Sequence, residues 1–262
     1  MSVTQTPDIN EVREYWDRRP CNIRHSYRKV GTREYFDDVE ARKYFVEYHI
    51  PGFANFPLWS GKRVLEVGCG IGTDAVNFAR AGAIYHGVEL SHESMVLAQT
   101  RFRVFGLSGS FLNVSGEELA SAFEADYFDL VYSFGVIHHT PNQRGMIEQM
   151  RKVIRPDGVF KFMVYAKNSW KDAMIEAGLD QPEAQSGCPI ATTYDSTMLQ
   201  DSLRGCFETV EVRQAHIFPY EVEEYVKYNY VKKPWFAAMP EDVFAALERR
   251  FGWHMLVTAR PI

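Results

Sequence analysis

Cysteine is scarce in this sequence of 262 residues, and its four copies are scattered. Cys21, Cys69, Cys188 and Cys206 form no Cys-x-x-Cys pair and none of the spacings that bind a metal ion. This excludes a disulfide framework and a cysteine-based zinc site, because both need paired or closely spaced thiols. We expect reduced thiols, as in a cytoplasmic protein, and no bound metal.

Long apolar runs and an excess of basic residues are also missing. No apolar run approaches the roughly 20 residues that a membrane span requires. The polar, acidic segment 1–16 lacks the pattern of a signal peptide. The net charge of −5 provides no general attraction to a phosphate backbone. We therefore expect no membrane span, no nucleic-acid partner and a location in the cytoplasm.

From Val64 to Tyr165 the sequence alternates short apolar runs with helical stretches. The expected strands are 63–67, 85–89, 110–114, 129–133 and 159–164, and the expected helices are about 73–82, 92–105, 117–124 and 142–153. The tetrapeptide 155–158, Arg-Pro-Asp-Gly, is expected to be a turn that ends the last helix and starts the fifth strand. This order favours an α/β fold in which a parallel sheet carries helices on both faces.

The regions on either side of this pattern are expected to cover the core. Residues 1–60 are aromatic and charged and are predicted to be helical, so we expect an N-terminal helical cover or lid there. The core is then expected to span 61–262. Its last part is predicted to contain a helix and two strands, at 195–205, 207–217 and 253–258.

Residues 64–74 combine a strand, a glycine-rich turn and the start of a helix. Gly68, Gly70 and Gly72 permit a tight turn and let the backbone approach a ligand closely, because no Cβ is in the way. Glu89 ends the next expected strand, where a carboxylate can accept hydrogen bonds from both hydroxyls of a ribose. The two features predict an adenosine-containing cofactor. The alternatives are a tight turn without a ligand and a surface glutamate.

The spacing of the glycines separates two classes of cofactor. A dinucleotide fold has G-x-G-x-x-G, with a helix N-terminus facing the pyrophosphate. Here the third glycine comes one residue earlier, and Glu66 precedes the loop. This disfavours the alternative of a nicotinamide-dependent oxidoreductase. The residues instead resemble the first motif of the class I S-adenosylmethionine-dependent methyltransferases, E/D-x-G-x-G-x-G.

The resemblance to this family, and in particular to its small-molecule members, covers roughly Lys62 to Tyr165. It implies a Rossmann-like seven-stranded sheet, with the last strand antiparallel, between layers of helices. It also implies S-adenosylmethionine as the cofactor, with Glu89 holding the ribose hydroxyls and Leu90 packing on the adenine. The cofactor-binding residues implied by the resemblance are Glu66, Gly68, Cys69, Gly70, Gly72, Thr73, Asp74, Glu89, Leu90, Ser91, Ser115, Gly116, Glu117, Ser133, Phe134 and Gly135.

One implied contact departs from the family pattern. Segment 113–119 lies where members of the family usually read G-D-A-E-x-L, with the Asp accepting a hydrogen bond from the adenine amino group. This chain has Ser115 at that place. The contact then weakens, or passes to Glu117 or to the backbone. Glu117 is equally well explained as an acidic residue in the first turn of a helix.

Residues 128–142 resemble the fourth motif of small-molecule methyltransferases, and the resemblance places His138 and His139 over the transferred methyl group. Methyl transfer needs an aligned acceptor and, for a hydroxyl or a protonated amine, a base. Histidine suits this role because its pKa lies near neutral. We favour His139 as the base and His138 second. The similar phosphoethanolamine methyltransferases suggest Tyr15 as the partner of His139. The alternatives are a packing role for both histidines and a zinc pair, which lacks a third ligand nearby.

Aromatic residues are dense in 9–50 and 216–236, the segments expected to surround the acceptor. They could enclose a flat or apolar acceptor, or serve only to bury the covers against the core. A helical insertion at about 219–251 is expected to form a lid or the contact of a homodimer. We expect the acceptor to be a small metabolite that is methylated on oxygen or nitrogen.

Two further classes of function are disfavoured. An RNA or protein methyltransferase fits poorly with the net negative charge. It also fits poorly with residues 133–136, which read Ser-Phe-Gly-Val where amino-group methylases have D/N-P-P-Y. The intact cofactor motifs also disfavour a catalytically silent binding protein.

Overall fold

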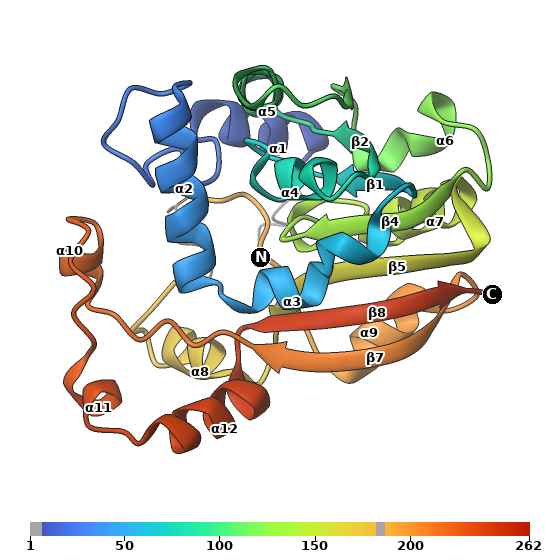
Figure 1. Ribbon diagram of the computed structural model, residues 1–262. Coiled ribbons are helices and arrows are strands. Elements are labelled where there is room, and N and C mark those ends of the chain that lie inside the picture. The colour runs from blue at the N-terminus through green and yellow to red at the C-terminus, as the bar shows by residue number, and fades with distance from the viewer. Residues whose placement is uncertain (1–6, 182–186) are drawn as a thin grey trace.

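The computed structural model describes residues 7–181 and 187–262 as one sheet with helices on both faces (Figure 1). Within these ranges eight strands form the sheet, in the order β3-β2-β1-β4-β5-β8-β7, with the short β6 paired to β5. Strands β1 to β5 are parallel, and β8 is antiparallel to both of its neighbours. The expected fold is confirmed, with β6 as an addition. The strands are β1 (Arg63–Val67), β2 (Ile84–Val88), β3 (Ser110–Leu112), β4 (Phe128–Phe134), β5 (Ile154–Ala166), β6 (Thr193–Tyr194), β7 (Phe207–Ala215) and β8 (His254–Pro261).

The helices of the core begin and end within two residues of the prediction, except that the one expected at 117–124 is divided between η2 and α6. Among the helices of the described ranges, none combines the length and apolar composition needed to cross a membrane. The helices are α1 (Ile9–Arg18), α2 (Arg33–Val46), α3 (His49–Ala54), η1 (Phe56–Trp59), α4 (Thr73–Arg80), α5 (His92–Phe105), η2 (Gly116–Glu118), α6 (Leu119–Ala122), η3 (Ile137–His139), α7 (Gln143–Val153), α8 (Trp170–Glu176), α9 (Ser196–Leu203), α10 (Val222–Tyr225), α11 (Pro234–Ala237) and α12 (Glu241–Phe251).

Alternating side chains of the strands build an apolar layer on each face of the sheet. Leu65 on β1 and Val131 on β4 belong to the layer covered by α7 and α9. Their neighbours Val64 and Leu130 belong to the layer covered by α3 and α4. Because successive side chains of a strand point to opposite faces, two buried faces require strands that are apolar throughout.

The fifth strand begins earlier than predicted. Ile154 follows α7 directly and pairs with Phe128, and the register then shifts so that Val159 pairs with Leu130. The four residues 155–158 therefore bulge out between two pairs of the same ladder. The prediction that this tetrapeptide is the turn that starts the strand is wrong, because backbone pairing with β4 exists on both sides of it.

Two segments far apart in the sequence meet near one end of the sheet, where Figure 1 shows α2 and α10. Arg42 on α2 joins them, because its Nη2 donates to the backbone oxygen of Tyr225 (2.6 Å) and its guanidinium lies 3.9 Å from the centre of the Tyr228 ring. The Tyr228 hydroxyl in turn donates to the backbone oxygen of Arg24 (2.8 Å). Segments from both ends of the chain are thus bound to each other as well as to the core.

The N-terminal helices are bound to the core through Arg101, a fully buried residue of α5. Its guanidinium donates to the Thr73 hydroxyl (2.7 Å), to the backbone oxygen of Phe36 (3.0 Å) and to the Glu40 carboxylate (3.0 Å). Burial lowers the pKa of Arg101, and the charge of Glu40 opposes this. A buried cation needs such a partner, since its own desolvation is unfavourable.

Glu40→Ala is expected to lower the free energy of unfolding by about 3 kcal/mol, because it leaves the buried Arg101 without its counter-charge. Urea unfolding measures this. The matched control is Glu148→Ala, which removes an exposed ion pair on α7 and is expected to cost about 0.5 kcal/mol. Equal losses for the two variants would contradict a structural role for the Arg101 pair.

Candidate functional site

The turn between β1 and α4 depends on three glycines. Gly68, Gly70 and Gly72 have φ values of 78°, 53° and 79°, which glycine adopts without the steric cost of a Cβ. A Cβ on Gly68 would lie 2.3 Å from Cγ2 of Val136, so a larger residue there requires rearrangement. A Cβ on Gly70 would meet nothing within 4 Å, and Gly70 borders a cavity. At Gly70 the loop therefore offers bare backbone to a ligand.

Glu89, at the end of β2, is bound to this loop. Its carboxylate accepts hydrogen bonds from the backbone N–H of Gly70 (2.7 Å) and from that of Ser91 (2.9 Å). Asn113 donates to the backbone oxygen of Glu89 (2.7 Å). Burial raises the pKa of Glu89, and the hydrogen bonds from the backbone of Ser91 and Gly70 oppose the rise. The carboxylate is thus held in a fixed position beside the glycine loop.

A cavity of about 580 Å³ lies along the carboxyl ends of β1, β2 and β4. It is enclosed by α1, α2 and the segment that follows β7. Twelve of the residues proposed from the sequence line it: Glu66, Gly68, Cys69, Gly70, Asp74, Glu89, Leu90, Ser115, Gly116, Phe134, Gly135 and His139. The other seven lie outside its wall: Tyr15, Gly72, Thr73, Ser91, Glu117, Ser133 and His138.

Several residues outside the wall hold the site together instead. Gly72 lets α4 approach α5, since a Cβ there would lie 3.1 Å from Cα of Ala98. Thr73 accepts a hydrogen bond from the buried guanidinium described above. Ser91 caps α5, and the Ser133 hydroxyl donates to the backbone of β1 (3.1 Å). These contacts fix helices and strands around the cavity.

Ser115 and Glu117, the two residues of segment 113–119 considered for the adenine contact, differ in position. The Ser115 hydroxyl accepts from the backbone N–H of Glu117 (3.1 Å), and Ser115 lines the cavity. The Glu117 carboxylate accepts from the Thr140 hydroxyl (2.6 Å) and from the backbone N–H of Asn142 (3.2 Å). Glu117 therefore fixes the loop that carries the two histidines.

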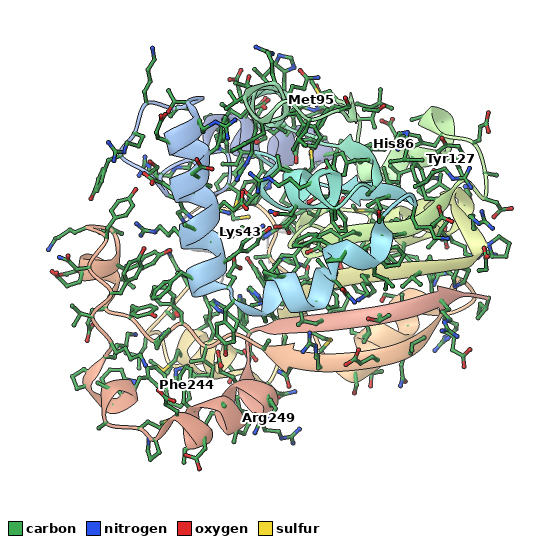
Figure 2. All side chains as sticks on the ribbon, in the orientation of Figure 1. Lys43, His86, Met95, Tyr127, Phe244 and Arg249 are labelled. Carbon is green, nitrogen blue, oxygen red and sulfur yellow. The ribbon has the colours of Figure 1, made fainter. Side chains whose placement is uncertain are left out.

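Two buried acidic residues, Asp74 and Glu66, lie next to the glycine loop. Oδ1 of Asp74 accepts from the Lys43 ammonium and the Tyr44 hydroxyl (both 2.9 Å), and Oδ2 accepts from the Tyr132 hydroxyl (3.1 Å). Burial and the nearby charge of Asp74 raise the pKa of Glu66 well above its usual range. Burial by itself would lower the pKa of Lys43. Asp74 and other nearby carboxylates have a larger combined effect in the opposite direction, so the pKa of Lys43 lies above its usual value. Lys43 reaches this place from α2 (Figure 2).

The two adjacent histidines have different surroundings. His138 is fully buried and stacks on Tyr165 with ring centres 3.8 Å apart, and burial lowers the pKa of His138 well below its usual value. Within the described ranges neither of its ring nitrogens has a hydrogen-bond partner. His139 lines the cavity, and its Nδ1 lies 2.5 Å from the backbone oxygen of Ile190. Since a carbonyl only accepts, the neutral ring carries its proton on Nδ1 and its basic nitrogen is Nε2.

The aromatic residue of the N-terminal helix α1 that packs on His139 is Trp16. Their ring centres are 5.3 Å apart, and Trp16 lines the cavity. Tyr15, which the sequence suggested, is buried behind the wall with its ring 5.0 Å from that of Trp16. Neighbouring residues of a helix point in directions about 100° apart. An error of one position in the alignment with the similar enzymes is therefore enough to put Tyr15 in the place of Trp16.

The sequence did not indicate a group of polar residues on the cavity wall that comes from distant elements. Lys43 and Glu47 belong to α2 and its end, His216 follows β7, and His254 begins β8. One signal was available: β8 runs antiparallel to β5, so its first residue lies at the edge where the parallel strands end. In the described part of the chain, no group of three or more His, Cys, Asp or Glu could hold a metal ion.

Comparison with known proteins identifies the central part of the chain. Residues 65–160 match a family model described as a methyltransferase domain. The ubiquinone biosynthesis O-methyltransferase of Salmonella paratyphi A is 31% identical over 45% of this chain and 49% of its own length. That of Neisseria meningitidis serogroup A is 27% identical over 52% of this chain and 68% of its own length. The chain thus spans about half the length of the first of these relatives.

Solved structures share the fold at low identity. The magnesium protoporphyrin IX methyltransferase of Synechocystis PCC 6803, with bound S-adenosylmethionine, has a TM-score of 0.59 and 15% identity over 99% of both chains. A [4+2]-cyclase has a TM-score of 0.57 and 21% identity over 97% of this chain and 96% of its own. Such likeness shows the fold and leaves the reaction open.

The family match covers the strands from β1 to β5, the glycine loop and the acidic residue after β2. As the resemblance implied, the last strand of the chain is antiparallel: β8 pairs in this way with β5. Sequence, sheet and family model therefore agree that residues 65–160 form a methyltransferase domain, within a sheet of the kind that the resemblance implied.

Proposed function

We propose that this protein transfers a methyl group from S-adenosylmethionine to a hydroxyl oxygen of a small molecule. The observation that carries the proposal is the cavity that borders both the Glu89–Gly70 pair and His139. The names of the curated relatives favour oxygen over the nitrogen that the sequence left open. The cavity volume of about 580 Å³ lies within the range of small-molecule sites, roughly 300–1,000 Å³.

The residues of the wall suit this cofactor at both of its ends. The bare backbone at Gly70 admits close contact, and Glu89 can accept hydrogen bonds from ribose hydroxyls. Leu90, Ser115 and Gly116 would surround the adenine. Lys43 would provide a cation for the carboxylate of the methionine end, beside Asp74. When bound, the cofactor supplies an activated methyl group.

The chain must then orient the acceptor, exclude water and remove a proton. His139 is our proposed base, because it lines the cavity and its Nε2 is the basic nitrogen. His138 lies behind the wall and would support its neighbour by packing. We propose that the helices of 1–60 and of the insertion at 219–251 serve as covers that keep water out. The contacts of Arg42 and Tyr228 between these two segments support this.

Other classes of function have weaker support. A nicotinamide-dependent oxidoreductase fits poorly with the glycine spacing and with the family match at 65–160. An RNA substrate fits poorly with a net charge of −5. A silent binding protein would bind the cofactor but would not turn over, so the histidine variants below separate it from an enzyme.

Removal of the Glu89 carboxylate is expected to weaken binding of S-adenosylhomocysteine about 100-fold, because two charge-assisted hydrogen bonds are lost. Calorimetry on Glu89→Ala measures the affinity, and Glu93→Ala on the exposed face of α5 is the control. The unchanged protein should gain several degrees of thermal stability with S-adenosylhomocysteine and none with NAD. Unchanged affinity of Glu89→Ala would contradict the proposed cofactor site.

His139→Ala is expected to lower turnover by about 10²- to 10⁴-fold without changing affinity for S-adenosylhomocysteine, since it removes the base but not the cofactor site. His138→Ala is expected to act mainly on stability, because its ring is buried outside the cavity. Transfer of labelled methyl groups to a panel of hydroxylated metabolites measures turnover. If both variants turn over like the unchanged protein, neither histidine is the base.

A further inference from the structure

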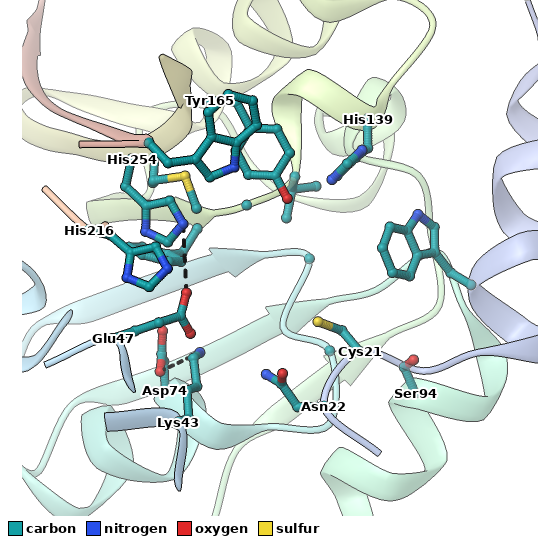
Figure 3. Close-up of a pocket in the computed structure, with 18 of the residues that line it drawn as sticks. Cys21, Asn22, Lys43, Glu47, Asp74, Ser94, His139, Tyr165, His216 and His254 are labelled. Carbon is teal, nitrogen blue, oxygen red and sulfur yellow. Dashed lines mark hydrogen bonds and ion pairs between the residues drawn. The ribbon is translucent and has the colours of Figure 1, made fainter. Parts of the chain in front are cut away.

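Three histidines and a carboxylate meet beside the cavity, and we call His49, His216, His254 and Glu47 the histidine cluster. Nε2 of His49 lies 3.0 Å from Nδ1 of His254, and the rings of His216 and His254 stack with centres 4.5 Å apart. Oε1 of Glu47 lies 3.8 Å from Nε2 of His254. Glu47, His216 and His254 line the cavity, and Figure 3 shows them together.

The protons of the cluster can be assigned from its neighbours. Burial lowers the pKa of His49 to about 3 and that of His254 well below its usual value, so both rings are neutral at pH 7. The carboxylate of Glu47 favours the proton of His254 on Nε2, the nitrogen nearer to it. Nδ1 of His254 then accepts from Nε2–H of His49. This leaves Nδ1 of His49 without a proton, and that atom has no hydrogen-bond partner in the described ranges.

The gap between Glu47 and His254 suits an O–H group. At 3.8 Å the two atoms are too far apart for a direct hydrogen bond. An oxygen placed about 2.8 Å from both Oε1 of Glu47 and Nε2 of His254 would see these two atoms at an angle of about 85°, so one oxygen atom can bond to both. It must donate to the carboxylate and accept from the imidazole N–H. The oxygen of a water molecule or of a neutral hydroxyl does both, whereas a carboxylate cannot donate and an ammonium cannot accept. A hydroxyl of a bound molecule can therefore take the place of a bridging water here.

We propose that Glu47 and His254 bind a hydroxyl group of the acceptor that is not methylated. This inference rests on the proposed methyl transfer and specifies its substrate class, a neutral molecule with a second hydroxyl. Tyr165 separates this place from His139: its ring centre lies 5.5 Å from that of His139 and 6.4 Å from that of His254 (Figure 3). The two hydroxyls of the acceptor would therefore lie on either side of Tyr165.

Phenol, benzoate and benzylamine test the proposal, because they share a ring and differ in the polar group. Protein saturated with S-adenosylhomocysteine and labelled with ¹³C in its histidine rings is titrated with each. Phenol is expected to shift the signals of His254 and His216. These signals are assigned by their loss in the spectra of His254→Asn and His216→Asn. Its dissociation constant is expected to be at least tenfold lower than those of the other two, since only a hydroxyl satisfies both partners.

Glu47→Gln is expected to weaken phenol binding about tenfold, because a charged acceptor becomes a neutral one. Glu148→Gln, the same change on the exposed face of α7, should leave it unchanged. Equal binding of benzoate and phenol, or no phenol-induced shift of His254, would overturn the subsite alone. Failure of S-adenosylhomocysteine to bind in the first step would remove the proposed function, and the subsite with it.

Discussion

The two hydrogen bonds from backbone amides to the Glu89 carboxylate are the contact on which the rest of the site depends. They bind the turn after β1 to the start of α5, two segments that the parallel pairing of β1 and β2 brings to the same edge of the sheet. The turn can present its amide to Glu89 because Gly68, Gly70 and Gly72 adopt positive φ. These N–H groups partly offset the burial of the charge, and within 7–181 and 187–262 no ion pair to Glu89 adds to them.

The acceptor end of the cavity is built in a different way. Here the wall comes from segments that the sheet does not order, α2 and the chain on either side of the insertion. What fixes them is a set of long-range polar contacts, such as Arg42 to Tyr225 and the backbone bond from Trp253 to His216 (2.8 Å). Such a division lets one fold serve different acceptors, because the covers can change while the loop and sheet remain.

The same division explains what the sequence could predict. The glycine loop, Glu89 and His139 belong to motifs whose geometry is fixed within a few residues, and the structure places Gly68, Gly70, Glu89 and His139 on the cavity wall. Lys43, Glu47 and His254 gave no local signal, since their meeting depends on contacts across about 200 residues of chain. The bulge at 155–158 was missed because pairing with β4, rather than turn propensity, decided where the strand begins.

The charges around the cavity suit a cationic methyl donor and a neutral acceptor. Lys43 is neutralised by Asp74 at 2.9 Å, and burial keeps His138 and His254 uncharged at neutral pH. Burial and, more weakly, the charge of Lys171 lower the pKa of His216 to about 4, and a hydrogen bond with the Val46 backbone opposes this. A sulfonium beside these groups would lie close to carboxylates and neutral imidazoles, which do not repel it. A buried, uncharged histidine also keeps one ring nitrogen that can accept a hydrogen bond, whereas a protonated ring can only donate.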